Sequence, residues 1–289
     1  MTRAWSFVFS LVALAALALL VGIFAVQSIP VWQHEGWNYL AGVKWFFRQK
    51  EFGALPMFYG SVAVSVVALA LAAPIGLGAA IFTSEYLSRT PRLAVKVLIE
   101  LLAGVPSVVY GLLGILLLRD WIYDLFERFE LLSGDTILTA GVLLAVMILP
   151  TIVTLSDDAM RAVPAAQRRA ARALGLTRAE TIFHISFPQA RRGLGAALLL
   201  SLGRALGETV AVFLVVGRQD NQLPNNWLSL RALLESGQTL TSKLGSSETN
   251  ISYGDPLHWA AIVGLGLLLL LITGGLTVLG TSFGKKTDA

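Results

Sequence analysis

Six stretches of this sequence are long and apolar enough to cross a lipid bilayer as helices, and this pattern constrains the fold more than any other feature. Residues 4–26 carry no charged side chain, and residues 257–279 carry only His258. A hydrocarbon core of roughly 30 Å takes about 20 apolar residues in a helix. The sequence therefore predicts an all-α polytopic membrane protein with six transmembrane helices, near residues 4–28, 58–83, 93–118, 137–155, 193–217 and 258–281.

The composition excludes several classes of protein. Only 14% of the residues are charged, whereas soluble chains carry about 25%. There is no cysteine for a disulfide scaffold, a thiolate metal site or a nucleophile, and the three histidines lie far apart. No phosphate-binding loop, dinucleotide-binding glycine pattern, zinc-protease motif or serine-hydrolase elbow occurs. We therefore expect a chain that is not an enzyme and that binds no metal or cofactor. Work against a gradient would take its energy from a partner or an ion.

The basic residues of the loops orient the predicted helices. With a cytoplasmic N-terminus, the 56 residues of the inside segments hold 12 Lys and Arg, and the 87 residues of the outside segments hold 8. This is the bias of the positive-inside rule. We expect both termini and the segments 84–92 and 156–192 in the cytoplasm. Because most of the basic excess is then a topology signal, we expect no nucleic-acid partner.

Two outside segments have features of their own. Segment 29–57 mixes tryptophan and phenylalanine with Lys44, Arg48 and Lys50, which is typical of an amphipathic helix lying against membrane lipids. In the polar segment 218–257 we expect a short helix around residues 227–236.

One pair of charged residues is predicted deep in the membrane. From a start near Gly193, Arg204 lies ~16 Å and Glu208 ~22 Å into the fifth span. Positions i and i+4 share a helix face, and a guanidinium matches the oxygens of phosphate or carboxylate. We favour an anion pathway lined by Arg204 and Glu208, in which Glu208 holds Arg204 when no anion is bound. A buried ion pair that only fixes helix packing is the alternative.

Weaker candidates lie in the third span. Glu100 and Lys96 repeat the i, i+4 spacing, and we favour a structural pair over a pathway role for Glu100. Pro106 removes a backbone donor and kinks or ends the helix, as Pro74 and Pro150 are expected to do in other spans. Ser107 follows this break and is a second minor pathway candidate.

The longest inside segment, 156–192, is predicted to form a helix–turn–helix. Residues 164–174 are rich in strong helix formers, and Gly175 provides a stop. Thr177 and Glu180 have the spacing of a capping box, which begins a second helix that Pro188 should end. Such a compact element suits the surface cleft of a partner protein, and a basic loop for lipid headgroups is the alternative.

This segment resembles the coupling motif of ABC importer permeases, E-A-A-x3-G-x9-I-x-L-P. In that family the motif docks onto the cytoplasmic ATPase. Two positions depart from it, since Arg169 replaces the usual glutamate and Phe187 the usual leucine. The matching residues, which the resemblance assigns to ATPase coupling, are Arg169, Ala170, Ala171, Gly175, Ile185 and Pro188.

Further blocks are similar to the phosphate importer permeases. Residues 101–111, 147–152 and 203–209 carry the signatures of that subfamily. Their sequences resemble the PstC-type subunit more than the paralogous PstA-type subunit. The resemblance spans about 60% of the chain, from residue 50 to 217. It places the transport-critical arginine and glutamate of the family on Arg204 and Glu208.

The resemblance implies a type I ABC importer permease fold in a bacterial inner membrane. Residues 1–57 would form the first helix and a periplasmic segment, and 58–289 the permease core. The implied partners are a second phosphate permease subunit, a dimeric cytoplasmic ATPase that uses ATP and Mg²⁺, and a periplasmic phosphate-binding protein. Three alternatives stay open: the paralogous subunit, a permease for sulfate, molybdate or phosphonate, and a membrane sensory protein without transport.

Overall fold

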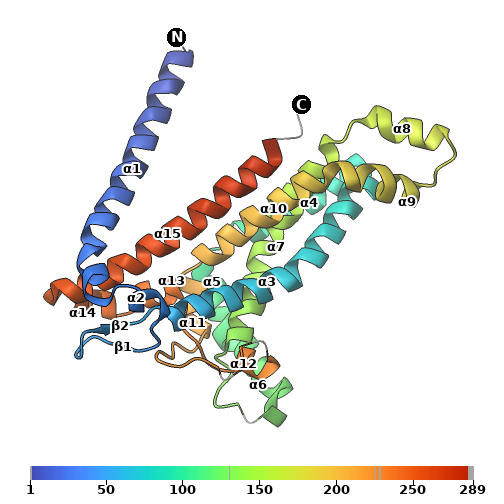
Figure 1. Cartoon of the computed structure of the whole chain (residues 1–289). Helices are drawn as coiled ribbons and strands as arrows, with labels where there is room; N and C mark the ends of the chain where they lie inside the picture. The colour runs from blue at the N-terminus through green and yellow to red at the C-terminus, as the bar shows by residue number, and fades with distance from the viewer. Residues whose placement is uncertain (1, 130, 225, 228, 286–289) are drawn as a thin grey trace.

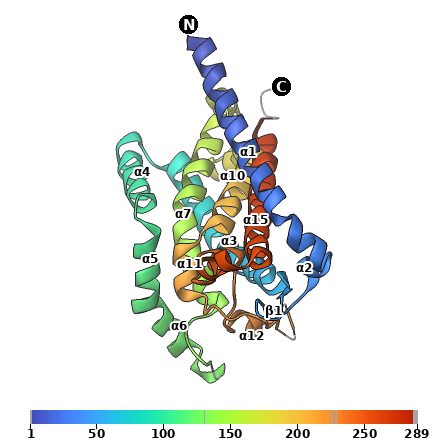
Figure 2. The same cartoon turned by 90° about the vertical axis from the view of Figure 1, so that its left-hand side faces the viewer.

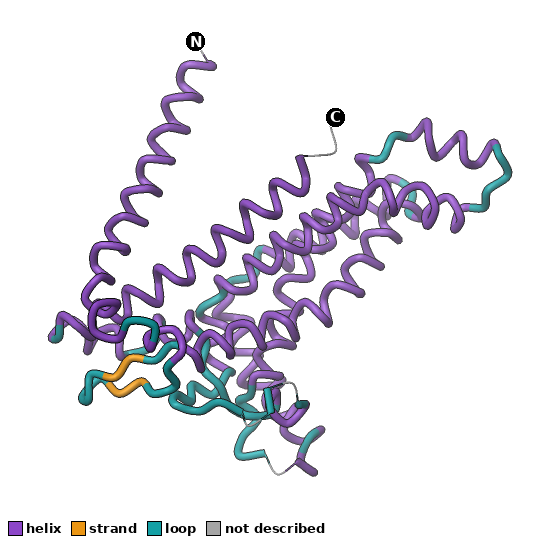
Figure 3. The backbone as a smooth tube through the Cα atoms, in the orientation of Figure 1, coloured by secondary structure: helices purple, strands orange, loops and turns teal. Residues whose placement is uncertain are grey.

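The computed structural model describes residues 2–129, 131–224, 226–227 and 229–285, and it is mostly helical (Figures 1 and 3). The long helices are α1 (Thr2–Glu35), α3 (Leu55–Ile81), α4 (Arg89–Ala103), α7 (Ile137–Ala162), α10 (Phe187–Gly207) and α15 (Pro256–Lys285). Shorter helices are α2 (Asn38–Ala41), α5 (Ser107–Leu113), α6 (Arg119–Leu125), α8 (Ala165–Ala173), α9 (Arg178–Thr181), α11 (Val210–Val215), α12 (Leu230–Leu233), α13 (Leu240–Leu244) and α14 (Glu248–Ile251).

The predicted helical membrane fold is confirmed, but two of the six spans are not single helices. Among the described residues, α1, α3, α7 and α15 are each long and apolar enough to cross a bilayer. The third predicted span is a bent pair, α4 followed by the run from α5 to α6, with an angle of 84° between them. The fifth ends at Gly207 and resumes as α11. Every 18-residue stretch of α10 also contains Arg191, Arg192 and Arg204, which lowers its hydropathy.

Small residues let the central helices approach closely. Helix α3 packs against α7, and α10 packs between α7 and α15. Ala68 and Ala72 are fully buried on α3, and a Cβ on Gly76 would lie 2.6 Å from Ile152 of α7. Glycine and alanine at helix contacts are typical of membrane bundles. The prolines Pro74 and Pro150 lie inside α3 and α7 without ending them.

The two ends of the bundle differ in structure. Helix α1 begins and α15 finishes toward the end where α8 and α9 project, which we call the α8–α9 end (Figure 1). Strands β1 (Trp45–Phe46) and β2 (Glu51–Phe52) lie with α6 and α12 at the opposite, hairpin end. Helices α4, α5 and α6 run along one side of the bundle (Figure 2).

The expectation of an interfacial helix in segment 29–57 is wrong. Helix α1 continues to Glu35, and after α2 the chain forms an antiparallel hairpin in which Trp45 pairs with Phe52. Both rings are buried and meet edge to face at 5.2 Å. These two rings are therefore not available to lipid headgroups, whereas Trp37, Phe46 and Phe47 are exposed beside them. Helix α12 is shorter than the predicted 227–236, and residue 228 lies outside the described residues.

Candidate functional site

Arg204 lies in the last turn of α10 and is exposed on the surface of this chain. Its Nη1 donates a hydrogen bond of 2.9 Å to Oγ1 of Thr151 on α7. The next two residues, Ala205 and Leu206, are buried, so the neighbouring face of α10 packs inside the bundle. The C-terminal end of a helix carries partial negative charge, which favours a cation there. A guanidinium on the outer face of a membrane helix is costly in lipid and needs a polar cavity or a protein partner.

The predicted pairing of Arg204 with Glu208 on one helix face is wrong. Helix α10 ends at Gly207, and Glu208 is extended, with φ −73° and ψ 121°. Oε1 of Glu208 accepts a hydrogen bond of 3.5 Å from the backbone N–H of Ala211 in the first turn of α11. Within the part of the chain described, no ion pair joins the two side chains. The prediction assumed one continuous helix, and the break turns the carboxylate toward α11.

Glu208 instead lies beside a group of buried hydroxyl side chains that the sequence did not single out. A small cavity beside Glu208 is lined by Ser61 and Ser65 of α3, by Thr239, which precedes α13, and by Thr241 within α13. Ser61 Oγ accepts a hydrogen bond of 2.9 Å from the backbone N–H of Leu240, and the two threonine hydroxyls are 3.1 Å apart. The cavity measures about 10 Å³, room for about one water. The i, i+4 spacing of the two serines was the available signal.

The break in the third span is confirmed, and one carbonyl group beside it, that of Leu102, accepts a side-chain hydrogen bond. Tyr110 Oη donates a hydrogen bond of 2.8 Å to the backbone oxygen of Leu102 across the break. Ser107 is half-buried in the first turn of α5. Glu100 is exposed on α4, and within the described chain no ion pair joins it to Lys96. Neither Glu100 nor Ser107 is joined to Arg204 by a described hydrogen bond, so the structure does not gather these four candidates into one site.

The coupling segment has the predicted helix–turn–helix. Gly175, with φ +87°, ends α8: its N–H bonds to Arg172 O at 3.0 Å, and Leu176 N–H to Ala171 O at 3.2 Å. This is the Schellman pattern, in which glycine supplies the left-handed residue. The Thr177–Glu180 capping box is present, and these backbone and side-chain hydrogen bonds from Thr177 lower the pKa of Glu180.

The motif residues of this segment have different surroundings. Arg169 and Ala170 are exposed, Ala171 is buried, and Ile185 is half-buried. The expectation that Pro188 ends the second helix is wrong, because it lies in the first turn of α10. A π-helical turn, η4 (Ile182–Ser186), joins α9 to α10. The wider turn accommodates a residue that has no N–H and would clash in an α-helix interior.

A buried lysine, Lys243, holds the hairpin end together, and this role was not predicted from the sequence. Lys243 Nζ contacts Oδ2 of Asp220 at 2.6 Å and also Oε2 of Glu248, and it lies 5.2 Å from the centre of the Trp45 ring. Glu248 in turn meets His258 Nε2 at 2.9 Å. These contacts join the hairpin, the loop before α12, α14 and α15.

The two carboxylates that share Lys243 have pKa values shifted in opposite directions. Burial raises the pKa of Asp220, and Lys243 offsets this only in part. Burial also raises that of Glu248, but hydrogen bonds and charge from Lys243, with bonds from Trp45 and His258, outweigh it and leave the pKa lowered. The two pKa shifts differ because Glu248 accepts hydrogen bonds from Lys243, Trp45 and His258, whereas Asp220 accepts one from Lys243. Oδ1 of Asp220 is buried and accepts no hydrogen bond from the described residues.

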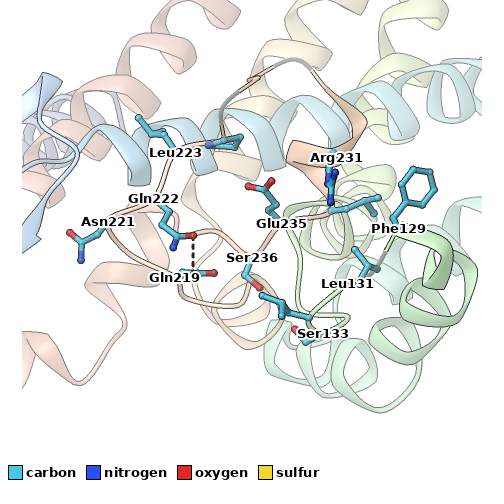
Figure 4. A pocket seen from close by; sticks show the side chains of 13 residues that line it. Phe129, Leu131, Ser133, Gln219, Asn221, Gln222, Leu223, Arg231, Glu235 and Ser236 are labelled. Carbon is cyan, nitrogen blue, oxygen red and sulfur yellow. Dashed lines mark hydrogen bonds between the residues drawn. The ribbon is translucent and has the colours of Figure 1, made fainter.

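A larger cavity opens at the hairpin end (Figure 4), and Arg204 is not among the described residues that line it. Its volume is about 560 Å³, and it lies between the segments 129–133 and 219–236. Arg231 and Glu235 line it together with Gln219 and Gln222, whose side-chain amides form a hydrogen bond of 3.0 Å. Among the described residues that line it, Arg231 and Glu235 are the ionisable ones.

Most of the chain matches a known family of membrane transport proteins. Residues 72–285 match the model of the family described as the binding-protein-dependent transport system inner membrane component. The chain belongs to this family. Membership agrees with the expectation that the chain is a membrane subunit of a transport system and not itself an enzyme.

Several relatives confirm the resemblance to the PstC-type group. The phosphate transport system permease protein PstC 2 of Mycobacterium tuberculosis is 34% identical over 88% of this chain and 82% of its own length. PstC of Mesorhizobium japonicum is 32% identical over 90% and 83%, and PstC of Xylella fastidiosa is 30% identical over 96% and 86%.

Two solved structures share the fold. A chain of a bacterial alginate ABC transporter in complex with a pentasaccharide-bound periplasmic protein has a TM-score of 0.62 at 13% identity, covering 100% of this chain and 97% of that one. A chain of the MetNI methionine ABC transporter in an inward-facing conformation has a TM-score of 0.55 at 17% identity, covering 78% and 93%. At these identities the likeness concerns the ABC importer permease fold alone.

Proposed function

We propose that this chain is the permease subunit of an ATP-driven importer that moves inorganic phosphate from a periplasmic binding protein into the cytoplasm by alternating access. Its family and its PstC relatives support the type of machine and the substrate. The single observation that carries the proposal in the structure is Arg204, an exposed guanidinium on a membrane helix. Its planar donors match phosphate oxygens in number and charge.

The position of Arg204 favours a pathway between two permeases. The side chain faces outward from the bundle and is held by Thr151 alone among the described residues. Helix α4 has no buried residue, and Leu93, Val97 and Leu101 are exposed on it. We infer that a second phosphate permease covers these surfaces, so that phosphate passes along the interface and Arg204 contacts it there. Glu208 acts on this path through the first turn of α11, and Glu100 and Ser107 are secondary candidates.

The α8–α9 end is the side we assign to the cytoplasm. The basic residues of α8, with the start of α1 and the finish of α15 on the same side, support this orientation under the positive-inside rule. The segment from Arg169 to Pro188 would then dock onto a dimeric ATPase that binds and hydrolyses ATP with Mg²⁺. The periplasmic phosphate-binding protein would dock at the hairpin end, where the cavity of Figure 4 lies.

The test is uptake of labelled phosphate by vesicles that carry this chain with its candidate partners, with ATP inside. We expect ATP-dependent uptake that excess sulfate does not compete away, and its loss in Arg204→Gln without loss of complex assembly. Arg191→Gln is the matched control, because Arg191 is an exposed arginine on the same helix near the α8–α9 end. Normal uptake by Arg204→Gln would contradict the pathway role, and competition by sulfate would move the substrate to another oxyanion.

A further inference from the structure

We propose that the buried ion pair between Glu85 and Arg168 is a positioning contact that transmits the movement of the coupling segment to α3 and α4. The proposal rests on the proposed function, because it assigns a route by which a movement of the ATPase reaches the membrane helices. It concerns residues outside both the coupling motif and the phosphate pathway.

The pair joins two elements that are far apart in the sequence. Arg168 is on α8, one residue before the motif position Arg169. Glu85 is in a π-helical turn, η1 (Phe82–Tyr86), which follows α3 and leads into α4. Arg168 Nη2 lies 3.0 Å from Glu85 Oε1, and the exposed fractions of the two side chains are only 17% and 4%.

Arg168 is held in one place by two further contacts. Its guanidinium donates to the backbone oxygen of Met160 near the end of α7 and, at 3.2 Å through Nε, to Oγ of Ser186 in η4. Both Ser186 and Met160 are fully buried. The arginine therefore meets α7, the π-helical turn before α10, and η1 at once. A planar group with donors in fixed directions is suited to this, whereas a lysine presents a single point charge.

A second arginine of the coupling segment contacts the same turn. Arg178, at the start of α9, donates a hydrogen bond to the backbone oxygen of Glu85. Its guanidinium also lies 4.8 Å from the centre of the Tyr86 ring, within the range of a cation–π contact. Both helices of the coupling segment are thus attached to one five-residue turn.

The electrostatics make the attachment depend on Arg168. Oε1 of Glu85 is buried and accepts no hydrogen bond from the described residues, so the charge of Arg168 is its main compensation. An uncompensated buried carboxylate is strongly unfavourable. Displacement of α8 therefore draws Glu85 with it, and the turn η1 carries this displacement to the helices on either side of it.

A neighbouring ion pair provides the matched control. Arg92 of α4 pairs with Asp157 of α7, and Thr83 Oγ1 donates to Asp157 Oδ1 at 3.1 Å. The side chains are 17% and 7% exposed, close to the values of the first pair. This pair fastens α4 and, through Thr83, the turn η1 to α7, and it has no described contact with α8 or α9. Its removal tests for general damage caused by loss of a buried charge.

The experiment compares Glu85→Gln, the double variant Glu85→Gln with Arg168→Gln, and Arg92→Gln in the full complex in proteoliposomes. The measured quantity is the number of ATP molecules hydrolysed for each labelled phosphate taken up. We expect this ratio to rise about ten-fold in Glu85→Gln and in the double variant, with Arg92→Gln near the wild-type value. In Arg168→Lys, which keeps the charge, this ratio should lie between that of the wild type and that of Glu85→Gln.

The double variant separates positioning from stability. Replacement of both partners leaves no unpaired buried charge, so the double variant should assemble and unfold like the wild type even where Glu85→Gln does not. A wild-type ratio in the double variant would overturn the proposal, as would an equal rise in Arg92→Gln. Failure of the wild-type complex to take up phosphate would instead contradict the proposed function.

Discussion

Two glycine-to-alanine substitutions, at Gly175 in the turn after α8 and at Gly195 in α10, are expected to have opposite effects on stability. Gly175 has φ +87° and no atom within 4 Å of a built Cβ. A substitution there meets no steric obstacle, and its cost is the left-handed backbone conformation alone. That cost is about 1–2 kcal/mol for an ordinary L-residue. Gly195, inside α10, has the same open space but ordinary helical dihedrals, so alanine should stabilise its helix by about 0.5–1 kcal/mol.

The assay is amide hydrogen exchange of the peptide that covers residues 170–176. A loss of 1–2 kcal/mol corresponds to about a 5- to 30-fold increase in the open population. We expect Gly175→Ala to speed exchange by that factor and to weaken co-purification with the ATPase. Gly195→Ala should leave this peptide unchanged. Gly175→Asn should lie close to the wild type, because asparagine tolerates the left-handed region.

Two results would refute this reasoning. Unchanged exchange in Gly175→Ala would show that the Schellman hydrogen bonds do not hold the end of α8. Equal damage from the asparagine and alanine variants would show that the effect of the alanine variant does not come from the sign of φ.

Three further predictions concern packing and charge. Gly141→Leu should lower stability by about 1–3 kcal/mol through overpacking, since a Cβ there would lie 2.5 Å from Val67 Cγ1; the thermal midpoint in detergent checks it. Lys243→Met should cost about 3 kcal/mol, because it leaves Asp220 and Glu248 without their shared cation, and the same midpoint should return toward wild type when both carboxylates are replaced by amides. The pKa of Glu248 is lowered in the folded protein. The stability that its ionised carboxylate contributes is therefore fully present at a pH above its pKa in the unfolded chain, and is lost as the pH falls through its pKa in the folded protein. The thermal midpoint of Glu248→Gln should fall less steeply in acid than that of the wild type.

The elements that depend on local sequence were predictable. Long apolar runs gave the approximate positions of α1, α3, α7 and α15. Gly175 and the Thr177 capping box marked the turn of the coupling segment, because their effects are confined to a few neighbouring residues.

The elements that depend on packing were not predictable. In the hairpin that replaces the expected helix, Gly42 and Gly53 approach so closely that a Cβ on Gly53 would lie 2.3 Å from Gly42. Sequence spacing indicates neither that approach nor the break after Gly207. Arg204 was chosen from its depth in the predicted span, the chemistry of its guanidinium and the family resemblance, whereas the direction of Glu208 depended on where α10 ends.

The hydrogen bond from Tyr110 to Leu102 has a mechanical consequence. It ties α5 to the last turn of α4 across the bend, which favours movement of the two helices as one unit. At an angle of 84° the two helix axes are nearly perpendicular. We expect a shift of α4 along its own axis to move α5 and α6 sideways, which would change the width of the bundle at the hairpin end.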